Sequence, residues 1–300
     1  MTTQPVAVIT GAARGIGLQT ARGLAATHRV ALLDLDGTGV RRAAAEIGRG
    51  AIAVTCDITS APSVNDAVSE VVEQCGGIDV VISNAGIATA GTLRHLDPDV
   101  VAAQINVNLI GNWRFIHACL PHVLARCGYV LGVASLAAIV PPVGLGAYGS
   151  SKAGLEHLLD VAREELAPLG VGVGVAYFSW IDTDMVRGVG RHHPGFERVR
   201  TRLPGPLGRA LEVEDAAQAI VRAVGQRAPR AFAPRWVAVV SRLRGVVGPL
   251  VARAGRSDAA ELDAVTAEVV AARGAFAGGL RPDDEASAAA ARSVERGPTA

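Results

Sequence analysis

The stretch Val6-Ala-Val-Ile-Thr10-Gly-Ala-Ala-Arg-Gly15-Ile-Gly17 predicts how this chain begins to fold. An apolar, β-branched run forms a strand, and a glycine-rich turn leads from it into a helix. Gly11 permits the tight turn. Because Gly15 and Gly17 have no side chains, backbone N–H groups at the helix start can approach a pyrophosphate. In this context the stretch, with Arg14 and Ile16 inside it, predicts a dinucleotide site rather than a plain turn.

Apolar runs alternate with segments of helical spacing along the rest of the chain. The expected strands are Val6–Thr10, Val30–Leu33, Ala51–Thr55, Val80–Ser83, Tyr129–Ala134 and Val171–Phe178. The expected helices include Gly15–Ala26, Ser63–Gln74, Val107–Ala125 and Glu212–Val224. Strands that are apolar on both faces and separated by helices indicate a parallel sheet with helices on both sides. We therefore predict an α/β fold, a Rossmann-type doubly wound sheet.

Three regions are expected. Residues 1–235 form the Rossmann-type domain, 236–275 a C-terminal helical extension, and 276–300 a flexible tail. No acidic residue occurs from Ala216 to Ser257, but eight arginines do. Within this part, Arg235–Arg253 is predicted to form one basic amphipathic helix, and Asp258–Arg273 a second one with Leu262, Val265 and Val269 on one face.

Composition excludes several classes of protein. Of the 300 residues, 50% are apolar and 19% are charged, which excludes disorder over most of the chain. The net charge of +1 gives no reason to expect nucleic-acid binding. Four widely spaced cysteines argue against a metal site or a disulfide framework and fit a cytoplasmic location. We expect no secretory peptide. The uncharged run between Arg126 and Lys152 contains Pro141–Pro142 and several glycines, so it is predicted as a strand and an irregular loop.

Polar residues at the ends of other predicted strands extend the dinucleotide site. Asp34 can accept hydrogen bonds from the ribose hydroxyls and repel a 2′-phosphate, which favours NAD, whereas Arg14 could favour NADP. Asp57, next to Ile58, could meet the adenine or cap the next helix. Asn84-Ala85-Gly86 is small enough for a cofactor to pass closely, or is a bare turn.

A tyrosine and a lysine at helical spacing suggest the chemistry. Tyr148 and Lys152, the only lysine of the chain, lie four residues apart in a helix expected to reach Ala167. A neighbouring ammonium favours the phenolate form of tyrosine, which makes it available as an acid or base. Ser135, after the fifth strand, can donate to a carbonyl oxygen or serve only as a turn residue. Asn108 can order a water beside Lys152 or satisfy a backbone group.

These motifs together resemble the short-chain dehydrogenase/reductase family over about residues 5–235. The resemblance rests on TGAARGIG, Asp34, Asn84-Ala85-Gly86, the asparagine of NVNL, Ser135 and YxxxK. It implies a catalytic set of Asn108, Ser135, Tyr148 and Lys152. In that set Tyr148 exchanges a proton with the substrate oxygen, and Lys152 binds the nicotinamide ribose and lowers the tyrosine pKa. Ser135 holds the carbonyl, and Asn108 supports a relay water.

The sequence departs from the family pattern at two places. Ser83 replaces the first asparagine of NNAG, and Phe178-Ser179-Trp180 stands where the family has Pro-Gly. Thr183 keeps the family match and is implied to bind the nicotinamide carboxamide. The second departure leaves the local backbone path open.

The expected substrate is a small hydrophobic alcohol or ketone, such as a steroid, a retinoid or a lipid-like carbonyl, because the segments 136–146 and 177–180 are apolar. His192 and His193 are expected on a lid surface. The family implies a homodimer or homotetramer through helices matching Val107–Ala125 and Tyr148–Ala167. Two other functions are considered: a catalytically idle dinucleotide sensor or scaffold, and a peripheral membrane protein acting through its basic C-terminal segment.

Overall fold

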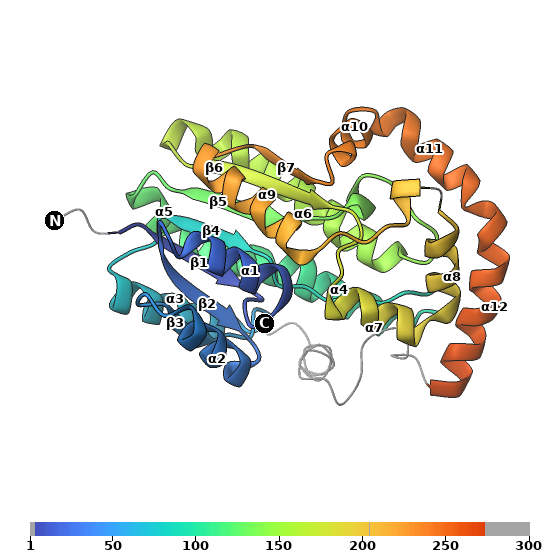
Figure 1. The fold of residues 1–300 in the computed structure, drawn as a ribbon, viewed down its shortest axis with the longest axis horizontal. Coiled ribbons are helices and arrows are strands. Elements are labelled where there is room, and N and C mark those ends of the chain that lie inside the picture. Colours follow the sequence, from blue (N-terminus) through green and yellow to red (C-terminus); the bar gives the residue numbers. More distant parts are fainter. Residues whose placement is uncertain (1–3, 204, 274–300) are drawn as a thin grey trace.

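The computed structural model describes residues 4–203 and 205–273. Seven parallel strands form one sheet in the order β3-β2-β1-β4-β5-β6-β7 (Figure 1). The order reverses between β1 and β4, and at this point the carboxyl ends of the strands leave a crevice for a ligand. The predicted α/β, doubly wound Rossmann-type fold is confirmed.

The strands follow the apolar runs closely. Their bounds are β1 Val6–Thr10, β2 Arg29–Asp34, β3 Ile52–Thr55, β4 Val80–Ser83, β5 Tyr129–Val133, β6 Gly172–Phe178 and β7 Arg230–Ala233. The first six agree with the predicted strands to within a residue. The seventh was not predicted: it has four residues, begins with an arginine and pairs only with β6 at the edge of the sheet.

Helices connect the strands and cover the sheet. The first group is α1 Gly15–Leu24, α2 Gly37–Ile47, α3 Ala61–Cys75, α4 Pro98–Ile105, α5 Asn112–Ala125 and α6 Gly146–Leu166. The second group is α7 Asp184–His192, α8 Pro194–Arg202, α9 Val213–Gln226, α10 Trp236–Arg242, α11 Arg244–Ala254 and α12 Arg256–Arg273. A π-helical segment, Asn106–Gly111, joins α4 to α5.

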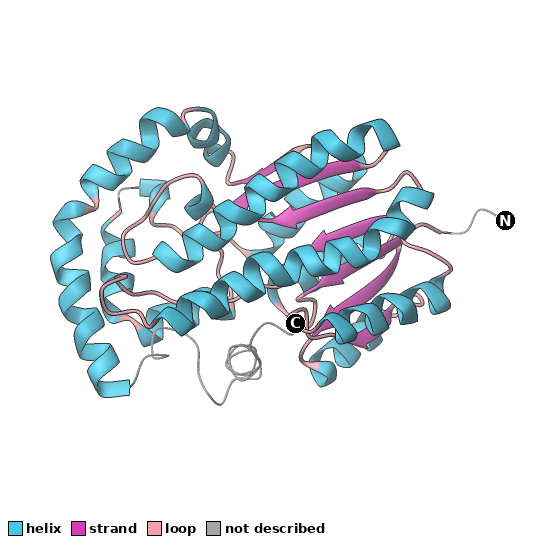
Figure 2. Cartoon of the chain, turned by 180° about the vertical axis from the view of Figure 1, so that it is seen from behind, coloured by secondary structure: helices cyan, strands magenta, loops and turns pink. Residues whose placement is uncertain are grey.

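Side chains alternate between the two faces of the sheet along each strand, and the sheet therefore divides the core into two halves. On β1, Val6 and Val8 pack with side chains of α3, α5 and α6, whereas Ala7 and Ile9 pack with those of α1, α2 and α9. Successive side chains of a strand point to opposite faces, so both faces need a cover of helices. Seen from behind, the long helices of the first group run across the sheet (Figure 2).

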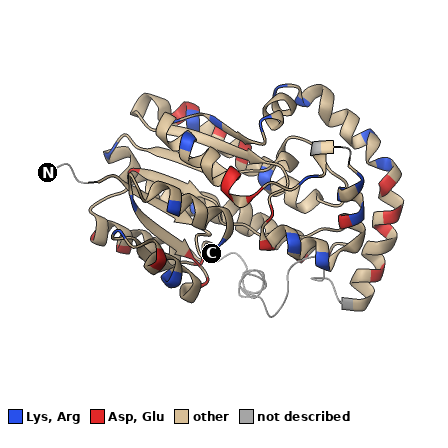
Figure 3. Cartoon of the chain, viewed as in Figure 1, with Lys and Arg blue, Asp and Glu red and all other residues tan. Residues whose placement is uncertain are grey.

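The C-terminal extension differs from the prediction. Arg235–Arg253 is not one helix: the chain turns at Leu243, and α10 and α11 lie on either side of this residue. Both helices, and α12 after them, pass around the end of the molecule that carries α7 and α8 (Figures 1 and 3). The helix predicted at Asp258–Arg273 is confirmed, with Leu262 fully buried. The predicted tail, 276–300, lies outside the described residues.

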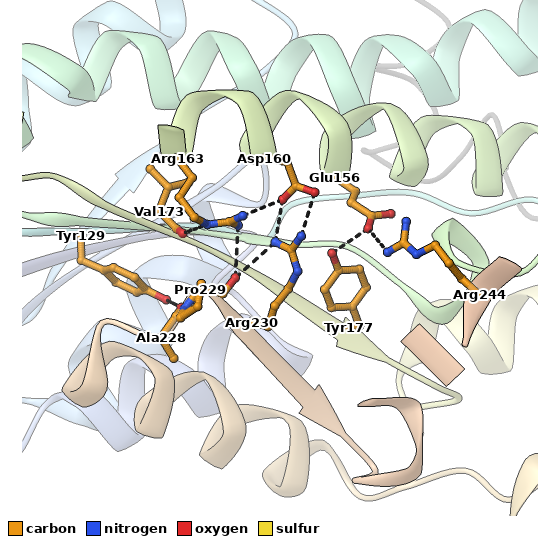
Figure 4. A network of polar contacts seen from close by, with 10 residues as sticks. All are labelled: Tyr129, Glu156, Asp160, Arg163, Val173, Tyr177, Ala228, Pro229, Arg230 and Arg244. Carbon is orange, nitrogen blue, oxygen red and sulfur yellow. Dashed lines mark hydrogen bonds and ion pairs between the residues drawn. The ribbon is translucent and has the colours of Figure 1, made fainter. Parts of the chain in front are cut away.

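Two groups of charged side chains fasten β7 and α11 to α6 (Figure 4). Arg230 of β7 makes two hydrogen bonds to the Asp160 carboxylate, at 2.6 and 2.7 Å. The buried carboxylate of Glu156 accepts hydrogen bonds from Tyr177 and Arg244. The arginine-rich end of the chain is therefore attached to the Rossmann core through ion pairs as well as apolar contacts.

No helix among the described residues is long and apolar enough to cross a membrane. The uncharged run between Arg126 and Lys152 forms β5, a short 3₁₀ turn and a loop, as the prolines and glycines predicted.

Candidate active site

A cleft of about 990 Å³ lies along the carboxyl ends of the strands. Most of the predicted site residues line it, and they come from every strand end between β1 and β6. They are Gly11, Arg14, Gly15, Ile16, Asp34, Asp57, Ile58, Asn84, Ala85, Gly86, Ser135, Tyr148, Lys152 and Thr183. Two predicted residues, Gly17 and Asn108, are not on its wall. Both of them support residues that do line the cleft.

The glycines of the first loop have different physical roles. Gly11 and Gly15 have φ of +65° and +57°, a region that other residues rarely adopt. Gly17 matters for packing: a Cβ there would lie 2.2 Å from the carbonyl oxygen of Gly11. Gly17 therefore permits a close contact between helix and loop, and its role in exposing N–H groups to a pyrophosphate stays a prediction.

The Asp34 carboxylate is tied to the backbone around it. It accepts hydrogen bonds from the N–H groups of Ala13, at 2.9 Å, and Asp36, at 3.1 Å. Its side chain also lines the cleft. Arg14 also lines the cleft, and its positive charge contributes to lowering the pKa of Asp184 at the start of α7, after the larger contribution of Arg187.

The alternative in which Asp57 caps a helix is wrong. Ser60 is the residue that caps α3, and its side chain accepts a hydrogen bond from the N–H of Ser63. Asp57 instead accepts from the N–H and the hydroxyl of Thr59, at 2.9 and 2.6 Å, and lines the cleft. A serine three residues from the predicted cap was the better candidate because the helix begins at Ala61.

Asn84 joins two strand ends. Its side-chain amide donates to the carbonyl oxygens of Thr10 and Gly11, while the Thr10 hydroxyl accepts from the N–H groups of Asn84 and Ala85. The segment 84–86 is therefore more than a bare turn. Thr10 is a site-forming residue that the sequence interpretation missed, since it was counted only as the end of a strand.

Tyr148, Ser135 and Lys152 meet in the middle of the cleft. Tyr148 and Lys152 project from α6, and Ser135 follows β5. The Ser135 hydroxyl accepts a hydrogen bond from the N–H of Ala137 at 3.1 Å, and its interaction with the Tyr148 phenol lowers the pKa of that group. The Lys152 ammonium is 6.0 Å from the centre of the Tyr148 ring and donates to the carbonyl oxygen of Val133 at 2.8 Å.

Burial sets the protonation of both α6 side chains. It raises the pKa of Tyr148 above its usual value, and the interaction with Ser135 offsets this only in part. It lowers the pKa of Lys152 to about 8. The tyrosine pKa therefore shifts in the opposite direction to the expectation based on its ammonium neighbour, because desolvation outweighs a charge that is turned towards Val133. Tyr148 is therefore a neutral phenol that holds its proton at neutral pH.

Asn108 lies in the π-helical segment and holds the loop after β4. Its amide oxygen accepts from the N–H of Ile87, and its amide nitrogen donates to the Ile87 carbonyl oxygen, both at 2.8 Å. The same nitrogen donates to the Ser151 hydroxyl at 2.9 Å. Asn108 therefore satisfies backbone groups, as one of its two predicted roles requires, and the water beside Lys152 stays a prediction. Ser151, which links Asn108 to the backbone of Tyr148, was missed.

Ser83 replaces an asparagine of the family pattern without leaving a polar group unpaired. Its buried hydroxyl donates to the side-chain oxygen of Asn112, and Asn112 donates to the carbonyl oxygen of Ala85. Sequence alone offered no signal for this pair, because the two residues are twenty-nine positions apart.

The segment after β6 brings a different set of residues to the cleft from the one expected. Phe178, Ser179 and Thr183 line it, but Tyr177 is buried elsewhere and bonded to Glu156. Residues 136–146 are all described, and none of them lines the cleft. Residues of α7 do, and they were not predicted as site residues: Met185, Val186, Gly188 and Arg191.

The two histidines are not equivalent. His192 lines the cleft, but His193 is fully buried, so its predicted place on a lid surface is wrong. The His193 ring accepts from the N–H of Phe196 and contacts the Thr266 hydroxyl of α12 at 2.9 Å. Burial lowers the pKa of His193. It joins α8 to the C-terminal helix rather than facing solvent.

A model of the family described as short chain dehydrogenase matches residues 5–194. The chain belongs to this family. The expectation of an oxidoreductase is confirmed with it.

Relatives of this short chain dehydrogenase include trans-4-hydroxycyclohexanecarboxylate dehydrogenase of Sinomonas cyclohexanicum, which is 33% identical over 73% of this chain and 85% of that protein. A single-site variant of actinorhodin polyketide ketoreductase, solved with NADPH, has a TM-score of 0.72 at 28% identity and covers 79% of this chain and 99% of its own. The 3-ketoacyl-(acyl-carrier-protein) reductase from Brucella melitensis, complexed with NADH, has a TM-score of 0.69 at 26% identity, covering 76% and 96%. The cofactor class expected from the sequence is the one these two neighbours carry.

Proposed function

We propose that this short chain dehydrogenase interconverts a secondary alcohol and a ketone, or an alcohol and an aldehyde, with NAD as its cofactor. One observation carries the proposal: Ser135, Tyr148 and Lys152 line a single cleft together with the glycine loop. A substrate oxygen can therefore meet the phenol of Tyr148 and the hydroxyl of Ser135 at the place where a dinucleotide would end.

The residues fit an acid-catalysed reduction and its reverse. The bound cofactor would supply a hydride to the carbonyl carbon. Tyr148, a neutral phenol, would give its proton to the carbonyl oxygen, and Ser135 would donate a hydrogen bond to the same oxygen. The Lys152 ammonium lies next to the segment Asn84-Ala85-Gly86, since a Cβ on Gly86 would be 3.4 Å from its nitrogen. That position suits a hydrogen bond to a ribose hydroxyl.

The residues around the first two strands fit NAD. Gly11 and Gly15 line the cleft at the start of α1, where the first N–H groups of a helix can bind a phosphate. The Asp34 carboxylate lines the cleft at the end of β2, where it can accept from ribose hydroxyls and repel a 2′-phosphate. Thr183, on the cleft wall at the start of α7, would hold the carboxamide.

Apolar side chains in the cleft support a hydrophobic substrate, such as a steroid, a retinoid or a lipid-like carbonyl. Ile87, Ala88, Phe178, Met185 and Val186 line the same cleft as Tyr148. Burial of apolar substrate surface against them would supply binding energy without requiring a charged group on the substrate.

Removing one hydroxyl tests the reaction. Tyr148→Phe should keep dinucleotide binding, measured by fluorescence of the reduced cofactor, and lose turnover by about 10²- to 10⁴-fold in a screen of hydrophobic alcohols and ketones. Tyr129→Phe is the matched control, because its hydroxyl bonds to Ala228 outside the cleft. Undiminished turnover in Tyr148→Phe would show that the role is misassigned. A catalytically idle sensor would bind the cofactor, and neither the unmodified chain nor Tyr148→Phe would turn over any substrate.

The cofactor preference has a separate test. Catalytic efficiency with NAD should exceed that with NADP by at least about tenfold, since a 2′-phosphate beside the Asp34 carboxylate is repelled. Asp34→Ser should reduce the difference in catalytic efficiency between NAD and NADP. A preference for NADP in the unmodified enzyme would overturn the assignment of NAD as the cofactor.

The outer side of α5 and α6 supports a homodimer or homotetramer. Ile110 of the π-helical segment and Val161 of α6 each expose 45% of their surface. Light scattering after size exclusion should give two or four chains, and Val161→Glu should shift the mass towards one chain.

The four cysteines support a cytoplasmic location. Cys56, Cys75, Cys119 and Cys127 are all free thiols, and burial raises the pKa of Cys56 to about 12. Thiols that persist without pairing are typical of a reducing compartment. Fractionation of cells that express the protein would test this.

A further inference from the structure

Helices α10 and α11 are apolar on two opposite faces. The inner face packs on the main core: Val237 is fully buried, and Trp236, Val240, Val247 and Val251 lie against the same cluster. The outer face carries Val239, Leu243, Val246 and Leu250, which expose 51–64% of their surface. A helix that covers its own core needs one apolar face. The second face is not explained by the fold of the chain.

The outer residues form a continuous stripe, called here the α10–α11 stripe. Val239 and Leu243 are four residues apart at the end of α10, and Val246 and Leu250 are four residues apart on α11, so each pair lies on one side of its own helix next to the bend at Leu243. Other exposed large apolar residues in the described part of the chain, such as Leu93 and Leu169, come from distant segments. A contiguous apolar strip of this kind marks an interaction surface.

Positively charged arginine side chains lie around the α10–α11 stripe. Arg235, Arg242, Arg253 and Arg256 are exposed, and the side chain of none of them hydrogen-bonds or forms a salt bridge with a residue that the structure describes. Arg242 precedes Leu243, and Arg253 follows Leu250 by one turn on the same side of α11. Acidic residues do not occur on either helix, and Figure 3 shows blue without red there.

Exposed apolar side chains with arginines around them favour one class of partner over another. Apolar side chains with flanking arginines fit the headgroup region of an anionic bilayer, where the side chains enter the acyl boundary and the guanidinium groups stay among phosphates. A second copy of the chain is a poorer fit, since a symmetric pairing of stripes would bring arginines against arginines.

We propose that the α10–α11 stripe docks this enzyme on the surface of an anionic membrane. The helices are held firmly enough for this, because Arg244 of α11 is bonded to the buried Glu156 of the core. Docking through the stripe would also place the end of the molecule that carries α7 and α8 at the lipid surface. The junction of α11 and α12 lies against the loop before α6, where a Cβ on Gly255 would be 2.7 Å from Val143. A lipid-dissolved substrate would thus meet the end of the enzyme that carries α7 and α8.

Sedimentation with vesicles tests the docking without any assay of turnover. The full chain is mixed at low salt with phosphatidylcholine vesicles that contain or lack phosphatidylglycerol. We expect sedimentation with the anionic vesicles only. Leu243→Ser/Leu250→Ser should abolish it, and Arg242→Glu/Arg253→Glu should weaken it by about 25-fold or more, since each arginine near such a surface contributes about fivefold.

Matched variants decide whether the stripe itself is responsible. Leu169→Ser/Leu207→Ser removes two exposed leucines elsewhere, and Arg42→Glu/Arg222→Glu reverses two charges elsewhere. Both should sediment as the unmodified chain does, with unchanged circular dichroism and melting temperature in all four variants. The proposal is overturned if the unmodified chain stays in solution, if the leucine pair of the stripe is dispensable, or if the distant charges matter equally. Self-association that is lost in Leu243→Ser/Leu250→Ser, without lipid binding, would assign the stripe to a second copy instead.

Discussion

Lys152 directs its ammonium at the carbonyl oxygen of Val133, 2.8 Å away, and not at the tyrosine four residues before it. The ring centre of Tyr148 is 6.0 Å from the same nitrogen. Both side chains belong to one helix and one cleft, so burial acts on both. It disfavours the charged form of each, which raises the tyrosine pKa and lowers the lysine pKa.

The burial of Lys152 predicts how stability depends on pH. The folded lysine loses its proton near pH 8, whereas the unfolded lysine keeps it until about 10.5, so between these values the unfolded state binds more protons. The free energy of unfolding therefore gains a contribution that rises with pH, by about 3 kcal/mol in total. Lys152→Met lacks this contribution. Its stability relative to the unmodified chain should fall by about that amount between neutral pH and about pH 10.5.

Urea denaturation across this pH range measures the difference. Tyrosine and cysteine ionisation also changes stability in alkali, but it does so equally in both proteins and cancels. A constant difference between the two proteins at every pH would mean that the Lys152 pKa is close to its usual value.

Asn108→Ala should destabilise the fold rather than simply slow the reaction. The asparagine satisfies both backbone groups of Ile87, and each polar group left unpaired in a buried place costs about 1–3 kcal/mol. We expect a total loss of about 2–5 kcal/mol in urea denaturation. Asn65→Ala, on the exposed side of α3, should change stability by less than about 0.5 kcal/mol. Equal stability of the two variants would contradict this role for Asn108.

The sheet was predictable because each central strand is a short apolar run bounded by turn residues. Six strands stand out in this way, but β7 does not: Arg230 and only three further residues complete it, and its place at the edge depends on pairing with β6. The bend at Leu243 could likewise not be predicted from the sequence, because the apolar spacing continues through it on both faces of the segment.

The site was predictable where residues follow a strand or share a helix face, as Asp34, Ser135, Tyr148 and Lys152 do. Roles that depend on tertiary partners were not. The buried His193 meets Thr266, seventy-three residues later, and Asn108 meets Ile87 across a loop. The direction of the Tyr148 pKa shift also depends on burial, which residue spacing does not report.

Gly17→Ala should disrupt the dinucleotide loop. The new Cβ would lie 2.2 Å from the Gly11 oxygen and 2.8 Å from the Gly11 carbonyl carbon, so the loop or α1 must move. We expect cofactor binding to weaken by at least about 100-fold, as a displaced loop loses its aligned N–H donors. Gly225→Ala, in α9, meets nothing within 4 Å and should instead raise stability by about 0.5–1 kcal/mol. Calorimetry with NAD and thermal melting measure the two effects; unchanged binding in Gly17→Ala would contradict the packing role.

Leu262→Ala should release α12 without unfolding the sheet. Leu262 is fully buried, but its cluster is a small one with Ala90, Leu145, Val189 and Phe196, away from the two halves of the main core. Leu155→Ala is the matched control, since this leucine is equally buried on α6 within the main core. Each truncation removes about 2–5 kcal/mol of packing. For Leu155 this loss should lower global stability in urea, whereas for Leu262 it should appear as faster hydrogen exchange confined to residues 256–273 and their contacts on α8, because a terminal helix can open on its own. Faster exchange throughout the sheet in Leu262→Ala would show instead that α12 and the Rossmann core unfold as one unit.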